Sequence, residues 1–507
     1  DYAFERAVAF NLTDQKPVML MKDNRSWLDT NNLVAIAPDE TDKIMFSIVS
    51  RVSDNEPGRV RTKNGDRATY SVMKTDLKKG SSRQVVSDTR FVVGAVHAPD
   101  GAMIAEHRYR EVSRGNHEVS ITKGKKVLFE RQNLSFNPLT IWGLDSSGEN
   151  LVLFIDEGEP YGLHRMSLDD GTLTRIELGH EGGTVAPVID SRSLQVVGFE
   201  LPGDKTIQIF EDPALKSQLE AIGAAMNGAA VTIESWTDDR SQSVIAVEHI
   251  GQPIDYYLFE PDVGALSPVG NKAPHLDARP LGQIEGISYH ARDGLLIHGY
   301  LTLPPGKARS DGPFPLILLP HGGPEANDTL GFDWWAQAYA AAGYVVIQPN
   351  FRGSIGYGTG FRDAGYGEFG DKMVTDILDA AVWADDEGVA VSGNACIVGA
   401  SYGGYAALMA PLHDEAAVRC VVAVNPLTNP FKFLSDYGYQ SFLVNSVERF
   451  LGVSRFDSAE SRQSITPTSR VNEFKVPVLL ISGDQDSTVP FEQSQDLANA
   501  ARGVADV

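Results

Sequence analysis

The chain has 507 residues, of which 42% are hydrophobic and 22% charged. This composition excludes a mainly disordered chain, a collagen and a coiled coil, and the length allows about two to four domains. The chain has 44 Lys and Arg residues against 67 Asp and Glu residues, which gives a net charge of −23. We therefore expect neither nucleic acid nor a membrane as a partner. The sequence contains no uninterrupted apolar run of about 18 residues, so it predicts no membrane span.

Short β-strands separated by turn signals make up the first 280 or so residues. Apolar runs such as residues 91–96 and 151–155 are bounded by Gly, Asp, Asn and Ser clusters. Residues 213–226 are the exception and favour a helix.

A weak repeat runs through this part. Its turns centre on Asp39, Asp100, Asp145, Asp190 and Asp238, and the last four are spaced by 45, 45 and 48 residues. A period of about 40–50 residues with several strands in each is typical of propeller blades, and a β-sandwich or unrelated hairpins are the alternative. Five units can be counted, and residues 1–32 resemble the tail of another. We therefore expect the N-terminal domain to be incomplete.

Alternating strands and helices begin at about residue 284. Residues 287–303 predict a hairpin that turns at Asp293-Gly294. Residues 371–387 predict an amphipathic helix, and residues 491–501 are also amphipathic. Continuous apolar strands, which predict a doubly wound, mostly parallel sheet, occur at residues 314–319, 344–347, 395–398, 421–424 and 478–481.

The two cysteines, Cys396 and Cys420, lie in apolar runs. Their spacing is typical neither of metal ligands nor of a redox pair. We interpret both as small residues buried in the core and expect no disulfide framework. The sequence predicts a soluble protein and leaves its compartment open, cytoplasmic or periplasmic.

A nucleophile elbow is predicted at residues 399–404, Gly-Ala-Ser-Tyr-Gly-Gly. The segment follows an apolar strand and precedes a helical stretch, which is the context that a G-x-S-x-G motif requires. Ser401 is the candidate nucleophile, and the backbone N–H of Tyr402 is the candidate donor to the oxyanion. A structural glycine turn is the alternative.

His321-Gly322-Gly323-Pro324 follows the strand at residues 314–319. The two glycines allow the backbone to approach a substrate carbonyl, and the N–H of Gly323 is the candidate second oxyanion donor. His321 precedes the nucleophile, whereas hydrolases of this type have the order Ser, Asp or Glu, His. We therefore expect a structural role for His321, with the role of general base as the alternative.

Asp484 and Asp486 follow the late strand at residues 478–481, where the acid of a catalytic triad belongs. Spacing alone permits either one, and a solvated loop is the alternative. No histidine follows His413, so the sequence holds no plausible triad base. We expect the protein to continue past Val507, and an inactive relative is the alternative.

With these residues identified, the sequence resembles the prolyl oligopeptidase family of serine peptidases, closest to its acylaminoacyl-peptidase and dipeptidyl-aminopeptidase-like branch. The resemblance covers residues from about 285 to 507. It rests on four segments, namely His321-Gly-Gly-Pro324, the run Asn-Phe-Arg-Gly-Ser-Ile-Gly-Tyr-Gly at 350–358, Gly-Ala-Ser-Tyr-Gly-Gly-Tyr at 399–405, and Asp486-Ser-Thr-Val-Pro490 with Gln493-Ser494.

The resemblance implies a β-propeller domain over residues 1–283 and an α/β-hydrolase domain over residues 284–507. It implies Ser401 as the nucleophile and Asp486 as the acid, because the family's acid stands three residues before Val-Pro. The histidine would follow Val507, roughly 30 residues after the acid. A seven-bladed propeller would admit short peptides, and Phe431 and Phe433 would line the S1 pocket or else belong to the core.

The function predicted from the sequence is a serine peptidase that acts on short peptides through an acyl-enzyme. A carboxylesterase is the alternative, and so is a non-catalytic peptide-binding relative if no histidine follows residue 507. We expect no cofactor and no metal, because the sequence has no convincing metal cluster or dinucleotide fingerprint, and residues 353–356 lack the lysine of a phosphate loop. The oligomeric state is not readable from the sequence. Relatives often form dimers or tetramers, so a homo-oligomer of either kind stays open for this chain. The absence of a clear paired-glutamate motif leaves exo- or endopeptidase activity and the P1 preference open.

Overall fold

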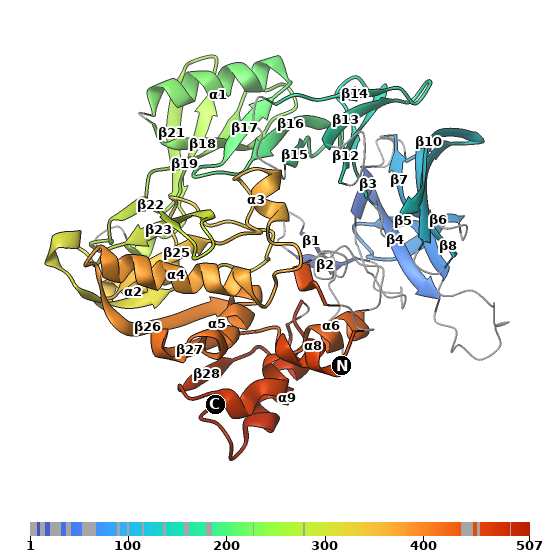
Figure 1. The fold of residues 1–507 in the computed structure, drawn as a ribbon. Coiled ribbons are helices and arrows are strands. Elements are labelled where there is room, and N and C mark those ends of the chain that lie inside the picture. Colours follow the sequence, from blue (N-terminus) through green and yellow to red (C-terminus); the bar gives the residue numbers. More distant parts are fainter. Residues whose placement is uncertain are drawn as a thin grey trace. The chain divides into compact units, whose positions relative to one another are not determined.

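In the computed structural model the chain divides into two compact units (Figure 1). The first comprises residues 1–179, 187–199 and 210–212, and the second comprises residues 180–186, 200–209 and 213–507. The domain boundary expected between residues 283 and 284 stays a prediction. No helix of the described part is long and apolar enough to cross a membrane. The described residues are 8–10, 16–20, 32–36, 42–52, 67–88, 92–98, 101–113, 116–134, 138–156, 162–178, 185–226, 228–276, 279–437, 450–453, 457–486 and 488–507.

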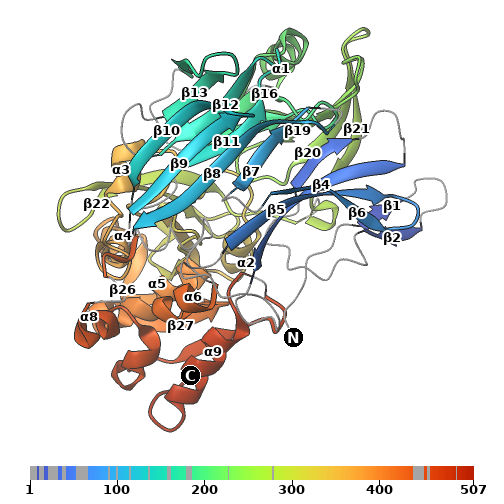
Figure 2. The same ribbon diagram turned by 90° about the vertical axis from the view of Figure 1, so that its right-hand side faces the viewer.

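Five small antiparallel sheets and one hairpin form the β-rich part, as far as it is described. Within each sheet consecutive strands lie next to one another, as in propeller blades, and Figure 2 shows this for β7 to β10. The five units counted in the sequence correspond to these five sheets. The helix expected at residues 213–226 is α1 (Pro213–Ala225).

The hairpin pairs β1 (Val8–Phe10) with β2 (Pro17–Met19). The sheets are β3 (Asn32–Ile36), β4 (Lys43–Val52), β5 (Arg67–Asp76) and β6 (Ser82–Asp88); β7 (Val92–His97), β8 (Met103–Ser113), β9 (Asn116–Lys123) and β10 (Lys126–Leu134); β11 (Leu139–Leu144), β12 (Asn150–Ile155), β13 (Gly162–Ser167) and β14 (Leu173–Arg175); β15 (Ala186–Ile189), β16 (Val196–Leu201) and β17 (Ile207–Phe210); and β18 (Ala230–Trp236), β19 (Ser243–Glu248), β20 (Asp255–Glu260) and β21 (Ala265–Asn271).

Three aspartates of the predicted repeat lie at the turn after the first strand of their sheet. Asp145 follows β11, Asp190 follows β15 and Asp238 follows β18. Asp145 and Asp190 are buried and accept hydrogen bonds from groups within their own turns. The repeat therefore reflects a turn whose polar groups an aspartate satisfies. Asp39 and Asp100 lie outside the described residues.

The second unit contains a mixed sheet of seven described strands. Their spatial order is β22 (Ile284–His290), β23 (Leu296–Thr302), β25 (Val345–Asn350), β24 (Phe314–Leu318), β26 (Ala390–Ala400), β27 (Val418–Val424) and β28 (Val478–Ile481). β22 and β23 form the predicted hairpin, and β24 to β28 run parallel to one another. The carboxyl ends of these parallel strands therefore meet at one edge, where ligands bind in open α/β sheets.

The helices that accompany this sheet are α2 (Trp334–Ala341), α3 (Thr359–Asp363), α4 (Lys372–Asp386), α5 (Tyr402–His413), α6 (Pro430–Tyr437), α8 (Ala459–Ser464) and α9 (Phe491–Ala501). Both amphipathic stretches predicted from the sequence are helices, namely α4 and α9. Short 3-10 helices occupy η1 (Pro274–Leu276), η2 (Arg309–Asp311), η3 (Glu415–Ala417) and η4 (Pro467–Glu473).

Alternate residues of the central strands face two separate hydrophobic cores. Leu316 and Leu318 of β24 belong to the core that includes residues of α4 and α5. Ile317 and Leu319, which point the other way, belong to the core that includes Ala336 of α2. Burial on both faces explains why these strands are apolar throughout.

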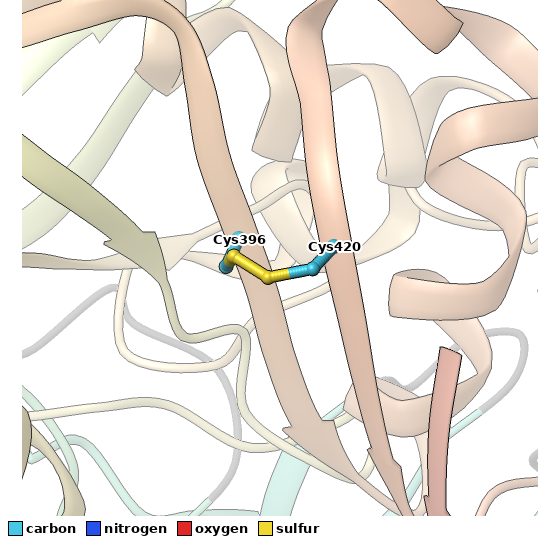
Figure 3. Close-up of a disulfide and its surroundings, with 2 residues drawn as sticks. All are labelled: Cys396 and Cys420. Carbon is cyan, nitrogen blue, oxygen red and sulfur yellow. A yellow bond between two sulfur atoms is a disulfide. The ribbon is translucent and has the colours of Figure 1, made fainter. Parts of the chain in front are cut away.

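The cysteines differ from the prediction. Cys396 on β26 and Cys420 on β27 stand directly opposite each other in the parallel register and form a disulfide (Figure 3). Their Cα atoms lie 4.6 Å apart. Both residues are half-buried, so the interpretation as buried, unpaired core residues is wrong. The bond joins the strand that leads to Ser401 to its neighbour.

A buried arginine joins three segments of the second unit. Arg352, in the loop after β25, donates to both carboxylate oxygens of Asp376 on α4 at 2.7 and 2.8 Å. It also donates to both oxygens of Asp293, in the β22–β23 turn, at 2.8 and 2.9 Å. Burial raises the pKa of Asp376, whereas the hydrogen bond from Arg352 lowers that of the more exposed Asp293 to about 2.

We predict that removing the disulfide destabilises the second unit. The double variant Cys396→Ser, Cys420→Ser should lose about 3 kcal/mol of unfolding free energy, because the bond closes a loop of 24 residues in the unfolded chain. Urea unfolding measures the loss. In the unmodified protein, alkylation under denaturing conditions should label neither cysteine before reduction and both after it. Two labelled thiols before reduction would contradict the disulfide.

We also predict that Arg352→Met lowers the free energy of unfolding by about 3 kcal/mol, because it leaves the buried Asp376 carboxylate without its cation. Lys372→Met, at the start of α4, is the matched control, since it breaks a more exposed pair with Glu368 and should cost well under about 1 kcal/mol. Urea unfolding measures both losses. Equal losses for the two variants would show that Arg352 stabilises the protein no more than an exposed ion pair does.

Candidate active site

Ser401 stands at a sharp turn between β26 and α5, as predicted. Its backbone has φ 56° and ψ −118°, a left-handed conformation that a residue with a side chain rarely adopts. The N–H of Ser401 donates to the carbonyl oxygen of Val424 on β27 at 3.0 Å, and its own carbonyl accepts from Tyr405 N–H at 3.0 Å. Ser401 is therefore fixed to the neighbouring strand and to the first turn of the helix.

Glycines surround this turn because the backbone has no room for side chains. A Cβ on Gly399 would lie 2.4 Å from the carbonyl carbon of Gly403. A Cβ on Gly403 would lie 2.2 Å from the carbonyl oxygen of Pro320. Both distances are shorter than any real contact. The packing of β26 against α5 therefore requires glycine at 399, and the close passage of the loop after β24 requires glycine at 403.

Tyr402 begins α5, directly after the serine. An N–H in the first turn of a helix has no intrahelical acceptor and lies at the positive end of the helix dipole. The Tyr402 side chain is buried, and its hydroxyl donates to the carbonyl oxygen of Phe369 at 2.8 Å. The side chain thus anchors the helix start, while the backbone N–H stands next to Ser401.

The loop after β24 passes directly beside Ser401. A Cβ built on Gly322 would lie 3.4 Å from Ser401 Cβ and 3.9 Å from its Oγ. Gly323, the next residue, has φ 123°, which glycine adopts without strain. The structure therefore brings the segment that carries Gly323 to the nucleophile. The importance of Gly322 lies in this close approach.

His321 is enclosed by the loop itself. Its Nδ1 lies 2.7 Å from the carbonyl oxygen of Gly322, and its Nε2 lies 2.9 Å from Oγ of Ser354. The ring stacks on Phe351 at a centroid distance of 4.4 Å. Burial lowers the pKa of His321 to about 4. With both ring nitrogens engaged and the neutral form favoured, His321 is built to hold the loop in place.

Asp486 lies between β28 and α9, and β27 separates β28 from the strand that carries Ser401. Its Oδ1 accepts hydrogen bonds from the N–H groups of Thr488 at 2.7 Å and Val489 at 2.8 Å. Asp486 is half-buried, whereas Asp484 is exposed. Of the two aspartates that spacing permits, Asp486 has the fixed carboxylate that orienting a histidine requires.

The base is not found among the histidines nearest in sequence to these residues. Residues 414–507 contain no histidine. His413 ends α5, the helix that Ser401 precedes, and twelve residues at 1.5 Å each put it about 18 Å away. Its Nε2 donates to the carbonyl oxygen of Gly370 at 2.8 Å. The expectation that a histidine follows Val507 stays a prediction.

The two phenylalanines predicted for the S1 pocket lie in different surroundings. Phe433 on α6 is buried in the main core of the second unit. Phe431 is half-buried, and the guanidinium carbon of Arg462 lies 5.9 Å from its ring centroid. Phe431 is therefore the one with surface left for a ligand. The S1 assignment of both stays a prediction.

Gln493, at the start of α9, has a role that the sequence pattern alone does not reveal. Its Oε1 accepts from the N–H groups of Thr428 at 3.0 Å and Asn429 at 2.7 Å. Thr428 Oγ1 in turn donates to the carbonyl oxygen of Gln493 at 2.6 Å. The buried amide thus joins the helix after the acid loop to the segment before Phe431. The only signal in the sequence was the Gln493-Ser494 pair, which is part of the motif that resembles the prolyl oligopeptidase family.

Among the described residues, no three or more His, Cys, Asp and Glu side chains gather as metal ligands would. The groups that follow the parallel strands at this edge of the sheet include the Ser401 hydroxyl, the Asp486 carboxylate and backbone N–H groups. Such a set serves acyl transfer by a nucleophile.

Known proteins are similar to this chain in both sequence and fold. Residues 330–506 match the profile of the prolyl oligopeptidase family. Dipeptidyl aminopeptidase BIII of Pseudoxanthomonas mexicana is 28% identical over 472 residues, which cover 89% of this chain and 67% of that protein. Dipeptidyl peptidase family member 6 of Caenorhabditis elegans is 28% identical over 334 residues, 59% of this chain and 45% of that one.

Among solved structures, a Mycobacterium tuberculosis puromycin-hydrolyzing peptidase is similar with a TM-score of 0.69 and 17% identity, over 99% of this chain and 77% of that one. This likeness confirms the propeller-plus-hydrolase fold. The chain spans two thirds or less of the length of the two curated relatives. Together with the elbow at Ser401, these matches show that the chain is similar in sequence to serine peptidases of the prolyl oligopeptidase family and has a similar fold.

Proposed function

We propose that the protein hydrolyses short peptides through an acyl-enzyme formed on Ser401. The observation that carries this proposal is the strained serine with the Gly322-Gly323 backbone passing beside it. Ser401 Oγ attacks the peptide carbonyl, and the N–H groups of Tyr402 and Gly323 stabilise the oxyanion. Asp486 orients a histidine supplied by sequence beyond Val507.

In this mechanism the histidine takes the proton of Ser401 Oγ and gives it to the leaving amine, so that the amine departs and the acyl group stays on the serine. Water, activated by the same histidine, then hydrolyses the ester. The proposal includes a propeller that excludes folded proteins. It also includes a homo-oligomer, either a dimer or a tetramer. The two curated relatives are named as a dipeptidyl aminopeptidase and a dipeptidyl peptidase, which supports peptides as the substrate class.

The test is fluorophosphonate labelling of the protein expressed from its complete reading frame. We expect one covalent adduct by intact mass spectrometry and hydrolysis of peptide anilides as well as esters. Ser401→Ala should abolish the adduct and reduce kcat by on the order of 10⁶, without changing the fold. Exposed Ser464 provides the control variant Ser464→Ala, which should label normally. Peptide hydrolysis retained by Ser401→Ala would overturn the proposal, and cleavage of esters alone would favour a carboxylesterase.

The two aspartates of the acid loop allow a matched pair of variants. Asp486→Asn should lower kcat by about 10⁴, because an amide favours the wrong tautomer of the histidine. Asp484→Asn should leave kcat within about twofold, because that side chain is exposed to solvent. Steady-state kinetics with one peptide anilide decides between them. A larger loss for Asp484→Asn would exchange the two assignments.

Gly322 offers a test of the space above the nucleophile. The methyl group of Gly322→Ala meets only ordinary contacts, the nearest at 3.4 Å, so the protein should fold normally. The methyl would occupy the space where the substrate carbonyl must lie, and we expect kcat/KM to fall about 100-fold. Gly286→Ala on β22, whose Cβ has no neighbour within 4 Å, is the control. Unchanged kcat/KM in Gly322→Ala would mean that the substrate binds elsewhere.

A further inference from the structure

The segment that carries Gly323 contains no helix or strand of its own. This oxyanion loop, residues 321–333, connects β24 to α2. A catalytic N–H must lie within about 2.7–3.1 Å of the oxyanion. A segment without regular structure can meet that demand only if contacts from outside fix its backbone. The hydrogen bonds to the oxyanion loop therefore show which residues set its position.

One set of contacts comes from the turn between β16 and β17, which belongs to the same compact unit. The N–H of Leu330 donates to the carbonyl oxygen of Asp204 at 3.0 Å. The side-chain amide of Asn327 donates to the carbonyl oxygen of Gly203 at 3.3 Å. Gly203 and Asp204 thus hold the far half of the oxyanion loop through their backbone.

A second set comes from Asn350 at the end of β25. Its Oδ1 accepts from the N–H of Asp328 at 2.8 Å, and its Nδ2 donates to the carbonyl oxygen of Asp328 at 3.1 Å. The N–H of Ile355 donates to the carbonyl oxygen of Ala326 at 3.1 Å. Asn350 is fully buried. The oxyanion loop is therefore fixed on this side too.

A chain of hydroxyl groups connects the two sets. Asn350 Nδ2 donates to the Tyr357 hydroxyl at 2.8 Å, which lies 3.4 Å from the Tyr300 hydroxyl. The Tyr300 hydroxyl donates to Asp204 Oδ1 at 2.5 Å. Burial raises the pKa of Tyr300, which keeps the hydroxyl protonated as a donor. All donors in this series of hydrogen bonds can thus point the same way, from Asn350 to the Asp204 carboxylate. In such an arrangement each hydrogen bond strengthens the next.

We propose that Tyr300 and Asp204 are positioning residues that hold the oxyanion loop, and with it the N–H of Gly323, in its catalytic place. The inference rests on the proposed function. Tyr300 is buried on β23 and fixes the Asp204 side chain. The backbone of Asp204 then fixes Leu330. Loss of the Tyr300–Asp204 bond should loosen the loop without touching substrate.

Tyr300→Phe is the first variant, in the protein expressed from its complete reading frame. A displaced oxyanion donor weakens only the transition state, so kcat should fall on the order of 10-fold while KM changes less than about twofold. The inhibition constant of a peptide aldehyde, which forms a tetrahedral adduct on the serine, should rise by about the same factor as kcat falls. The substrate is a peptide anilide.

Tyr289→Phe is the matched control. Tyr289 is also a buried tyrosine of the same unit, and its hydroxyl donates to the carbonyl oxygen of Asp376 at 2.8 Å, outside the oxyanion loop. It should lower the melting temperature as much as Tyr300→Phe does, with kcat unchanged. Equal kcat values for the two variants would overturn the inference.

Asp204 provides the second variant pair, because its exposed side chain can be changed without loss of folding. Asp204→Asn keeps an oxygen that accepts from Tyr300 and should retain kcat within about twofold. Asp204→Ala should reproduce the loss in kcat that Tyr300→Phe shows. Full activity in Asp204→Ala would overturn the inference. A wild-type protein that neither cleaves the anilide nor binds the aldehyde would overturn the proposed function and the inference together. Failure of the inference alone differs from this, because the wild-type protein is then active and only the variants depart from the predicted values.

Discussion

The left-handed backbone of Ser401 is the constraint on which the catalytic half of the molecule depends. A non-glycine residue at such torsion angles costs of the order of 1–3 kcal/mol and persists only where the surroundings enforce it. Here β27 holds the serine N–H through Val424, and α5 holds its carbonyl. Gly399 allows the strand to approach the helix, and Gly403 allows the loop after β24 to approach the helix, within distances that no side chain would permit. The result is a hydroxyl presented at the carboxyl edge of the sheet.

The remaining groups reach this edge on irregular segments, and each segment is fixed by polar contacts from other elements. Asn350 and residues 203–204 hold the oxyanion loop. Gln493 holds the segment before Phe431, and the backbone of the acid loop holds Asp486. Buried polar groups must be paired to be tolerated, so these contacts stabilise the loops and define their positions at the same time.

Much of this could be predicted from the sequence, because periodicity and turn chemistry are local. Runs apolar on both faces identified the parallel strands, and the glycines around Ser401 identified the elbow. The disulfide could not be predicted, because it depends on the register that places Cys396 opposite Cys420 on a neighbouring strand. A shift of one residue would have moved one sulfur to the other face. For the same reason, the pairing of Gln493 with Asn429, 64 residues away, is visible only in the folded chain.

The most direct test of the account is a crystal structure of the complete protein with a peptide boronate bound. The account predicts a covalent bond from Ser401 Oγ to boron. One boronate oxygen should lie about 2.7–3.1 Å from the N–H nitrogens of both Tyr402 and Gly323, with the other in reach of a histidine that contacts Asp486. A boronate bonded to another residue, or an oxygen that contacts neither N–H, would contradict it.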